Sequence, residues 1–295
     1  MRKPRAQTAD PLPMLPPLPG WIVTAPAETL ETAAFRSGAA LAHLVSVTAS
    51  ADLPQALWRD RLALAAAETC VSLAGRREGT GALRDAVHLT RPGDDPGPSG
   101  RVLRQWVRAT ARPISVAGLA GALEGVATEQ IAHCLDAVGE SPVERAAQVI
   151  EAVLADRPRA ETASLILADA VLSRALAWDH VVPLLALGLK ARNLRLRGDD
   201  LRLACHRAAA AAVGQAVPLA ADLARRAARL QAVAPKLRAK PAGRAVDLFL
   251  SRDALAPGGL SFMSDRAARR LCDRLVDLGA LRELTGRDTF RLYGL

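Results

Sequence analysis

Residues 264–279, which read SDRAARRLCDRLVDLG, decide how the end of this chain folds. Ser264 is a residue type that caps the N-termini of helices, and Gly279 is the type that ends them, because glycine adopts a positive φ without strain. Between these two residues apolar side chains recur at three- and four-residue steps, and arginines occupy the early positions of the opposite face. The stretch therefore predicts an amphipathic helix from Ser264 to Leu278, with one buried and one basic face.

Two elements precede this helix. Residues 244–251 predict a first helix, and residues 254–260 predict a short second element that a Pro-Gly-Gly sequence interrupts. The basic segment 235–243 comes before them and is broken by proline and glycine, as domain boundaries often are. We therefore expect residues 242–295 to form a unit of their own.

A pair of strands is predicted after the helix. Residues 281–284 and 289–293 flank a Thr-Gly-Arg-Asp turn. In the second strand Phe290 and Leu292 alternate with other residues, so these two side chains are expected to be buried. Helices followed by a two-stranded hairpin with a basic tip is the order of a winged helix-turn-helix, in which the third helix enters the major groove and the wing lies along the DNA backbone.

The positive charge of the chain is concentrated toward its end. The 295 residues carry a formal net charge of +9, of which +7 lies in residues 222–295, with 15 lysines and arginines against 8 aspartates and glutamates. Such asymmetry is expected of a segment that meets phosphates or another polyanion. Two other interpretations fit the same residues: a solvated surface from an arginine-rich genome, and a winged helix that binds protein partners or dimerises.

Three arginines of the 264–278 helix share one face on a 3.6-residue period, opposite the leucines that the core must take. Arginine–phosphate contacts would supply most of the affinity for double-stranded DNA, and the start of the helix would read the bases. The predicted DNA-binding residues are Ser264, Arg266, Arg269, Arg270, Arg287 and Arg291.

The rest of the chain predicts a mainly α fold. Half of the residues are apolar but only 3% are aromatic, and alanine, leucine and arginine, which favour helices, are abundant. After a proline-rich arm at 1–25, consecutive helices are expected over 26–235, and the clearest lie at 54–74, 141–155 and 160–177. The prediction is a multi-helix bundle followed by the small winged unit.

Several classes of protein are not expected. No apolar run is long enough to span a membrane, and the proline-rich start lacks the apolar segment of a secretory signal. The cysteines are far apart and form no CxxC pair, which favours buried free thiols in a reducing cytoplasm over a metal site. These cysteines are Cys70, Cys134, Cys205 and Cys272. A cytoplasmic protein without a metal, a cofactor or a membrane partner is expected.

A second group of polar residues flanks a proline- and glycine-rich loop at 89–100. Long ordered loops are where binding sites tend to lie, so a ligand pocket with paired charges is one interpretation. A helix-connecting loop held by Arg–Asp pairs is the other. The residues of the possible ligand pocket are Arg77, Glu78, His88, Arg91, Asp94, Asp95, Arg101 and Trp106.

The end of the chain also resembles a known family. Residues 278–293, LGALRELTGRDTFRLY, are similar to the winged-helix tail attached to many Fic-domain proteins, and the whole chain resembles a bacterial family of unknown function, often plasmid-borne, that shares this ending. Residues 74–86, AGRREGTGALRDA, are similar to the helix that precedes the Fic core. There Glu78 and Gly79 match the inhibitory motif, and Ala74 stands in place of its hydroxyl residue. The resemblance implies a Fic-like helical body.

The catalytic motif of the Fic family, His-Pro-Phe-x-Asp/Glu-Gly-Asn-Gly-Arg, has no counterpart in this sequence. Residues 153–164 stand at its expected place and read VLADRPRAETAS. They offer no histidine to deprotonate a target hydroxyl and no glycine-rich turn for phosphates. The Fic-like body is therefore expected to be degenerate, and no catalytic residue can be carried over from the family.

Together these features predict a cytoplasmic DNA-binding or regulatory protein that acts through a C-terminal winged helix. Two alternatives stay open. One is a nucleotide- or protein-modifying enzyme that uses relocated catalytic residues on the Fic-like body. The other is a partner-binding component of a plasmid-maintenance or toxin–antitoxin system, which acts with a protein partner or as a homodimer.

Overall fold

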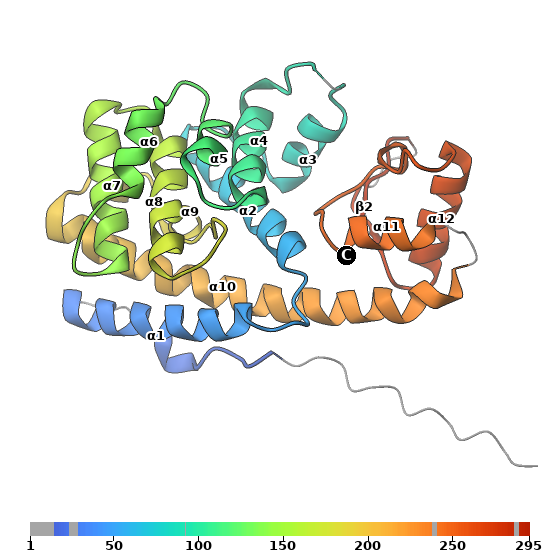
Figure 1. Ribbon diagram of the computed structural model, residues 1–295, viewed down its shortest axis with the longest axis horizontal. Helices are drawn as coiled ribbons and strands as arrows, with labels where there is room; N and C mark the ends of the chain where they lie inside the picture. The colour runs from blue at the N-terminus through green and yellow to red at the C-terminus, as the bar shows by residue number, and fades with distance from the viewer. Residues whose placement is uncertain (1–14, 24–28, 92, 238–240, 286–288) are drawn as a thin grey trace, which may run out of the picture.

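Helices dominate the computed structural model, which describes residues 15–23, 29–91, 93–237, 241–285 and 289–295. Within these ranges twelve α-helices and one pair of two-residue strands form the fold (Figure 1). The mainly α architecture that the composition predicts is therefore confirmed, together with a small hairpin near the end of the chain.

The longest described helix, α10 (Gly198–Val233), runs along the length of the body in the view of Figure 1 and leads into the C-terminal segment. α1 (Leu30–Thr48) packs along it, after a short 3₁₀ turn, η1 (Gly20–Ile22). Most of the residues that α10 buries are alanines. Their small side chains let the neighbouring helices lie close to the α10 backbone, so that this helix forms the base of the hydrophobic core.

The other body helices lie on the opposite side of α10 from α1 (Figure 1). They are α2 (Gln55–Leu73), α3 (Thr80–His88), α4 (Gly97–Ala111), α5 (Val116–Ala120), α6 (Thr128–Leu135), α7 (Pro142–Asp156), α8 (Glu161–Ala175) and α9 (Leu185–Gly188), with the turns η2 (Asn193–Arg195) and η3 (Ala234–Lys236). The helices predicted at 54–74, 141–155 and 160–177 are confirmed as α2, α7 and α8. Ser141 caps α7, because its hydroxyl accepts the N–H of Glu144 at 3.2 Å.

A carboxyl group lies in the centre of the body. Asp169 of α8 is fully buried, and its two oxygens accept the backbone N–H groups of Leu184, Leu185 and Ala186 at 3.0, 2.8 and 3.2 Å. Asp169 therefore satisfies the N–H groups that begin α9. Burial raises the pKa of Asp169 to about 7, against the three N–H donors, which lower it.

We expect Asp169→Asn to destabilise the fold by about 1–3 kcal/mol, because the new amide group sets a donor against the N–H of Ala186. The loss should depend on pH. The folded pKa of about 7 lies above the unfolded value of about 3.9, so the folded state binds this proton more tightly. The stability that Asp169 contributes is then full below about pH 4 and is lost as the pH rises through about 7.

Urea unfolding of the wild type and of Asp169→Asn between pH 4 and 8 measures this effect. The destabilisation by Asp169→Asn should be largest near pH 4 and should fall and then change sign as the pH rises through about 7, because a pKa raised from about 4 to about 7 is worth about 4 kcal/mol. A difference that stays constant over this range would show that Asp169 does not titrate there.

The C-terminal unit comprises residues 241–285 and 289–295 of the described chain. Its elements are α11 (Ala242–Phe249), η4 (Pro257–Gly259), α12 (Asp265–Asp277), β1 (Arg282–Glu283) and β2 (Tyr293–Gly294). The strands pair antiparallel. α12 is the helix predicted from the sequence: the Ser264 hydroxyl accepts the N–H of Ala267 at 3.4 Å, and Gly279 has a φ of +65°. Part of the predicted boundary at 235–243 lies outside the described residues, and a separable unit stays a prediction.

One prediction about the second strand is wrong. Phe290 is 71% exposed and has a φ of +59°, whereas Tyr293 is 2% exposed. The left-handed backbone at Phe290 breaks the alternation, so the regular strand begins only at Tyr293, which pairs with Glu283 and exchanges two backbone hydrogen bonds of 2.9 Å with Leu255. Leu292 is buried as predicted.

The four cysteines are free and buried, as predicted. Among the helices that the structure describes, none combines the length and the apolar character needed to cross a lipid bilayer.

Candidate functional site

The exposed face of α12 carries the arginines that the sequence singled out. Arg266, Arg269 and Arg270 are exposed, while Leu271 and Leu275 of the same helix are buried. The helical period places the two sets on opposite faces, because the leucines are held in the core of the unit. The structure thus brings three guanidinium groups together on the first two turns of one helix.

The ion pair on this face is weak. Arg269 bonds Asp265 at 2.9 Å, but their side chains are 68% and 60% exposed. Such a pair contributes little, since water competes with it and both side chains lose conformational freedom. An incoming phosphate can therefore replace Asp265 as the partner of Arg269 at small cost.

The structure describes two of the other predicted DNA-binding residues, Ser264 and Arg291. Ser264 is exposed, and its hydroxyl oxygen is engaged in capping α12. Arg291 is exposed and approaches Glu283 of β1 at 3.8 Å. Arg287 lies outside the described residues. We define the α12 surface as Arg266, Arg269 and Arg270.

The residues around the loop at 89–100 form local pairs. Glu78 accepts hydrogen bonds from Arg76 and from the Ser99 hydroxyl, at 2.8 Å each. The hydrogen bonds from Arg76, and then the one from Ser99, lower the pKa of Glu78 to about 2. Asp95 pairs with Arg101 at 2.6 Å.

The remaining members of the predicted pocket are spread over the same region. Arg77 and Arg91 are exposed, and the backbone oxygen of Asp94 accepts from Arg104 at 3.0 Å. Trp106 is fully buried and donates to the Cys70 sulfur at 3.3 Å. The pair between Asp95 and Arg101 agrees with the interpretation that this loop connects two helices and is held by Arg–Asp pairs. His88 is the one predicted pocket residue that lines the cavity described below.

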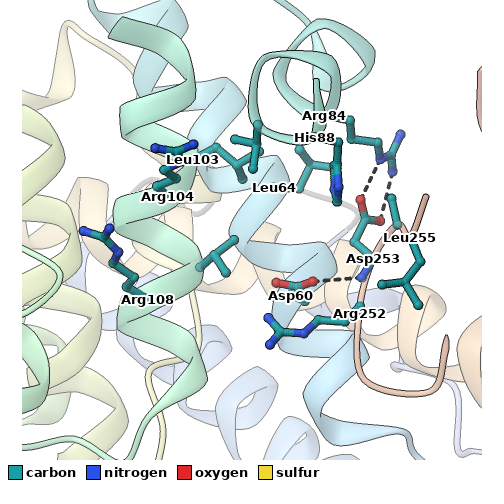
Figure 2. A pocket seen from close by; sticks show the side chains of 13 residues that line it. Asp60, Leu64, Arg84, His88, Leu103, Arg104, Arg108, Arg252, Asp253 and Leu255 are labelled. Atoms are coloured by element: carbon teal, nitrogen blue, oxygen red, sulfur yellow. Dashed lines mark hydrogen bonds and ion pairs between the residues drawn. The ribbon is translucent and has the colours of Figure 1, made fainter. Parts of the chain in front are cut away.

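A buried carboxylate joins the C-terminal unit to the body. Asp253 is 6% exposed, and both of its oxygens accept from Arg84 of α3, at 2.6 and 3.0 Å. Arg61 of α2 forms a second ion pair with Asp253. The backbone N–H of Asp253 donates to Asp60 of α2 at 2.8 Å, which Figure 2 shows beside the Arg84 contacts. These four residues are called the Asp253 cluster below.

The backbone near the Asp253 cluster is closely packed. A Cβ atom on Gly294 would lie 2.4 Å from the backbone oxygen of Asp253, so only glycine fits at this position of β2. Arg61 also donates to the backbone oxygen of Leu295 at 3.3 Å. The last strand of the unit is therefore held against α2 through the same arginine that binds Asp253.

A cavity of about 420 Å³ adjoins the Asp253 cluster. It lies between α2, α3 and α4 of the body and residues 252–255 of the C-terminal unit (Figure 2). Its volume falls in the range of about 300–1,000 Å³ that is typical of small-molecule sites. Sequence reasoning missed this cavity, since its walls come from segments far apart in the chain.

The charged side chains that line the cavity differ in how deeply they are buried and in whether they have a partner. Burial raises the pKa of Asp60, while the N–H of Asp253 counteracts that effect. Arg84 is held by Asp253. Arg252 is exposed, and its side chain makes no ion pair or hydrogen bond with the residues that the structure describes. The cavity thus has neutralised groups at its base and accessible cations at its edge.

The chain matches the model of a protein family. A family model described as "Protein of unknown function (DUF1403)" matches residues 6–295, so the match extends over the helical body and the C-terminal unit alike. A comparison with curated proteins finds no match.

Proposed function

The chain belongs to the family described as "Protein of unknown function (DUF1403)", and from this premise we propose that it is a DNA-binding regulatory protein whose C-terminal unit is a winged helix-turn-helix. The observation that carries the proposal is the α12 surface. Three exposed arginines lie on the first two turns of the last helix of the unit, with the hairpin directly after it.

The order of the elements supports this assignment. α11, the short η4 element and α12 precede the β1–β2 pair, which is the order expected of a winged helix. In helix-turn-helix proteins the N-terminal residues of the recognition helix contact the base edges. Arg266, Arg269 and Arg270 stand in that part of the helix, whereas Arg274 lies in its second half together with Asp273 and Asp277.

The chemistry of the side chains supports the same partner. A guanidinium group binds phosphate oxygens through two parallel N–H donors, so three of them on one face suit the regularly spaced phosphates of a duplex. The helical body would then position this unit through the Asp253 cluster. The body itself is proposed to be Fic-like and without nucleotidyl transfer.

Replacing Arg266 or Arg270 by alanine is expected to weaken duplex binding by a similar factor on unrelated sequences. Each lost phosphate contact should make the negative slope of log K against log salt shallower by about 0.9. If Arg270 instead bonds a guanine edge, its loss should cost about 1–3 kcal/mol and relax the preference at one base pair.

Fluorescence anisotropy of labelled duplexes over a range of salt concentrations measures both quantities. Arg159→Ala is the matched control, because Arg159 is an exposed arginine of the body, in the turn that precedes α8. Equal salt slopes for the wild type, the two α12 variants and the control would exclude phosphate contacts by these arginines.

A further inference from the structure

We propose that the cavity beside the Asp253 cluster binds a small organic anion, namely a carboxylate with an apolar body. The cavity has a volume of about 420 Å³ and lies where the body meets the C-terminal unit. Binding at this place is independent of whether α12 contacts DNA.

The apolar part of the ligand is defined by the cavity walls. Leu64 of α2 and Leu103 of α4 are buried side chains that line it, and Val87, Val107 and Leu255 complete the wall. Ligand sites in proteins are lined mainly by such side chains, with a few polar groups that fix orientation. An alkyl chain or an aromatic ring of moderate size fits this lining.

The charge of the ligand follows from which groups are already satisfied. Asp253 is occupied by Arg61 and Arg84, and Asp60 by the N–H of Asp253. Asp253 is therefore fully engaged within the protein, and one oxygen of Asp60 is engaged as well. A cationic ligand would have at most the second oxygen of Asp60 as a partner, and it would be repelled by the arginines that line the cavity.

Three arginines at the cavity remain able to bind an anion. Arg104 donates a hydrogen bond to the backbone carbonyl of Asp94. Because this acceptor is neutral, the positive charge of Arg104 is not neutralised. Arg108 pairs with Glu124 at 3.1 Å, but the side chains are 50% and 76% exposed, so this pair is easily exchanged. Arg252 lies across the cavity from them, near Asp60 (Figure 2).

His88 adds a polar group at the α3 side of the cavity (Figure 2). A ligand seated here touches α2–α4 of the body and residues 252–255 of the C-terminal unit at once. It therefore binds better when the two parts are docked, and by linkage its binding stabilises the docked state.

The test uses the full chain and calorimetric titration with sodium octanoate and with sodium 2-naphthoate, which have a flexible and a rigid apolar body. We expect saturable binding of at least one of them at one site per chain. Octylamine and 1-octanol have the same number of carbon atoms as octanoate but no negative charge, and they should bind at least tenfold more weakly.

The double variant Arg104→Ala, Arg252→Ala should weaken carboxylate binding by about tenfold or more, since hydrogen bonds to charged groups are lost. Arg112→Ala, Arg159→Ala is the matched control, because it removes the same charge from exposed positions outside the cavity. Val107→Phe, which fills the cavity from a partly buried position, should abolish binding.

Three results would overturn the proposal: no saturable binding of either carboxylate, equal binding of octylamine, or binding that survives unchanged in both the double variant and Val107→Phe. Circular dichroism of each variant verifies that the fold is retained.

Discussion

Replacing Asp253 by alanine is expected to destabilise the protein by about 3–5 kcal/mol, the cost of removing one partner from a buried ion pair. Asp253 is 6% exposed, and the Arg84 and Arg61 side chains that bind it are 13% and 17% exposed. Without the carboxylate, two poorly hydrated guanidinium groups face each other unpaired.

The destabilisation should be concentrated in the C-terminal unit. The Asp253 cluster connects residues 252–255 with α2 and α3, so its loss releases the unit from the body before the body itself unfolds. Amide hydrogen exchange should therefore rise in α11, α12 and the hairpin more than in α7 and α8. Urea unfolding gives the total change in free energy.

Asp265→Ala provides the matched control for Asp253→Ala. Asp265 belongs to the same unit and also binds an arginine, Arg269, but that pair is exposed, so its loss should change stability by less than about 1 kcal/mol. If the two variants unfold at the same urea concentration, the Asp253 cluster does not hold the unit to the body.

The elements that the sequence predicted well are those whose signals are local. The helix from Ser264 to Leu278 was predicted from a capping serine, a terminal glycine and an apolar period, which all lie within sixteen residues. α7 also begins at a local signal of this kind, the capping serine Ser141. These interactions need no knowledge of distant segments, and the structure contains both caps.

The second strand shows where local pattern fails. The spacing of Phe290 and Leu292 suggests that both side chains face the core. The positive φ of Phe290 instead turns its side chain toward the solvent. The buried position belongs to Tyr293, whose hydroxyl donates to Asp273 of α12 at 3.2 Å. Tyr293 also pairs through its backbone with Leu255, a contact that the spacing of residues along the chain does not indicate.

The contact between the C-terminal unit and the body through the Asp253 cluster was not predictable from sequence pattern, for a related reason. Asp253 and Arg84 are 169 residues apart, and no short sequence pattern contains both of them. Asp253 stands beside Arg252 in a short irregular segment, where an exposed local pair would be the ordinary expectation. Only the packing of α2 and α3 against this segment brings the arginines to it.

The predicted pocket around the 89–100 loop shows that a high density of charged residues does not by itself identify a binding site. Charged residues near a proline-rich loop can line a site or can tie the loop to a helix, and the sequence does not distinguish these outcomes. In the structure Asp95 binds Arg101 of α4, and Glu78 binds Arg76. His88 faces the cavity instead because it ends α3 beside residues 252–255.

The central claim, that the α12 surface binds duplex DNA, is tested most directly by reversing its charge. The triple variant Arg266→Glu, Arg269→Glu, Arg270→Glu should lose measurable affinity for duplex DNA, because three attractive phosphate contacts become repulsive. The fold should survive, since the three positions are exposed and glutamates near a helix N-terminus interact favourably with its dipole.

The measurement is the anisotropy of a labelled duplex titrated at moderate salt with the wild type, the triple variant and a matched control. The control, Arg159→Glu, Arg192→Glu, Arg195→Glu, makes the same change in net charge at exposed arginines of the body. We predict that the wild type and the control bind and that the triple variant, with unchanged circular dichroism, does not. Equal duplex affinity for the folded triple variant and the control would contradict the proposal that α12 is the DNA-binding surface.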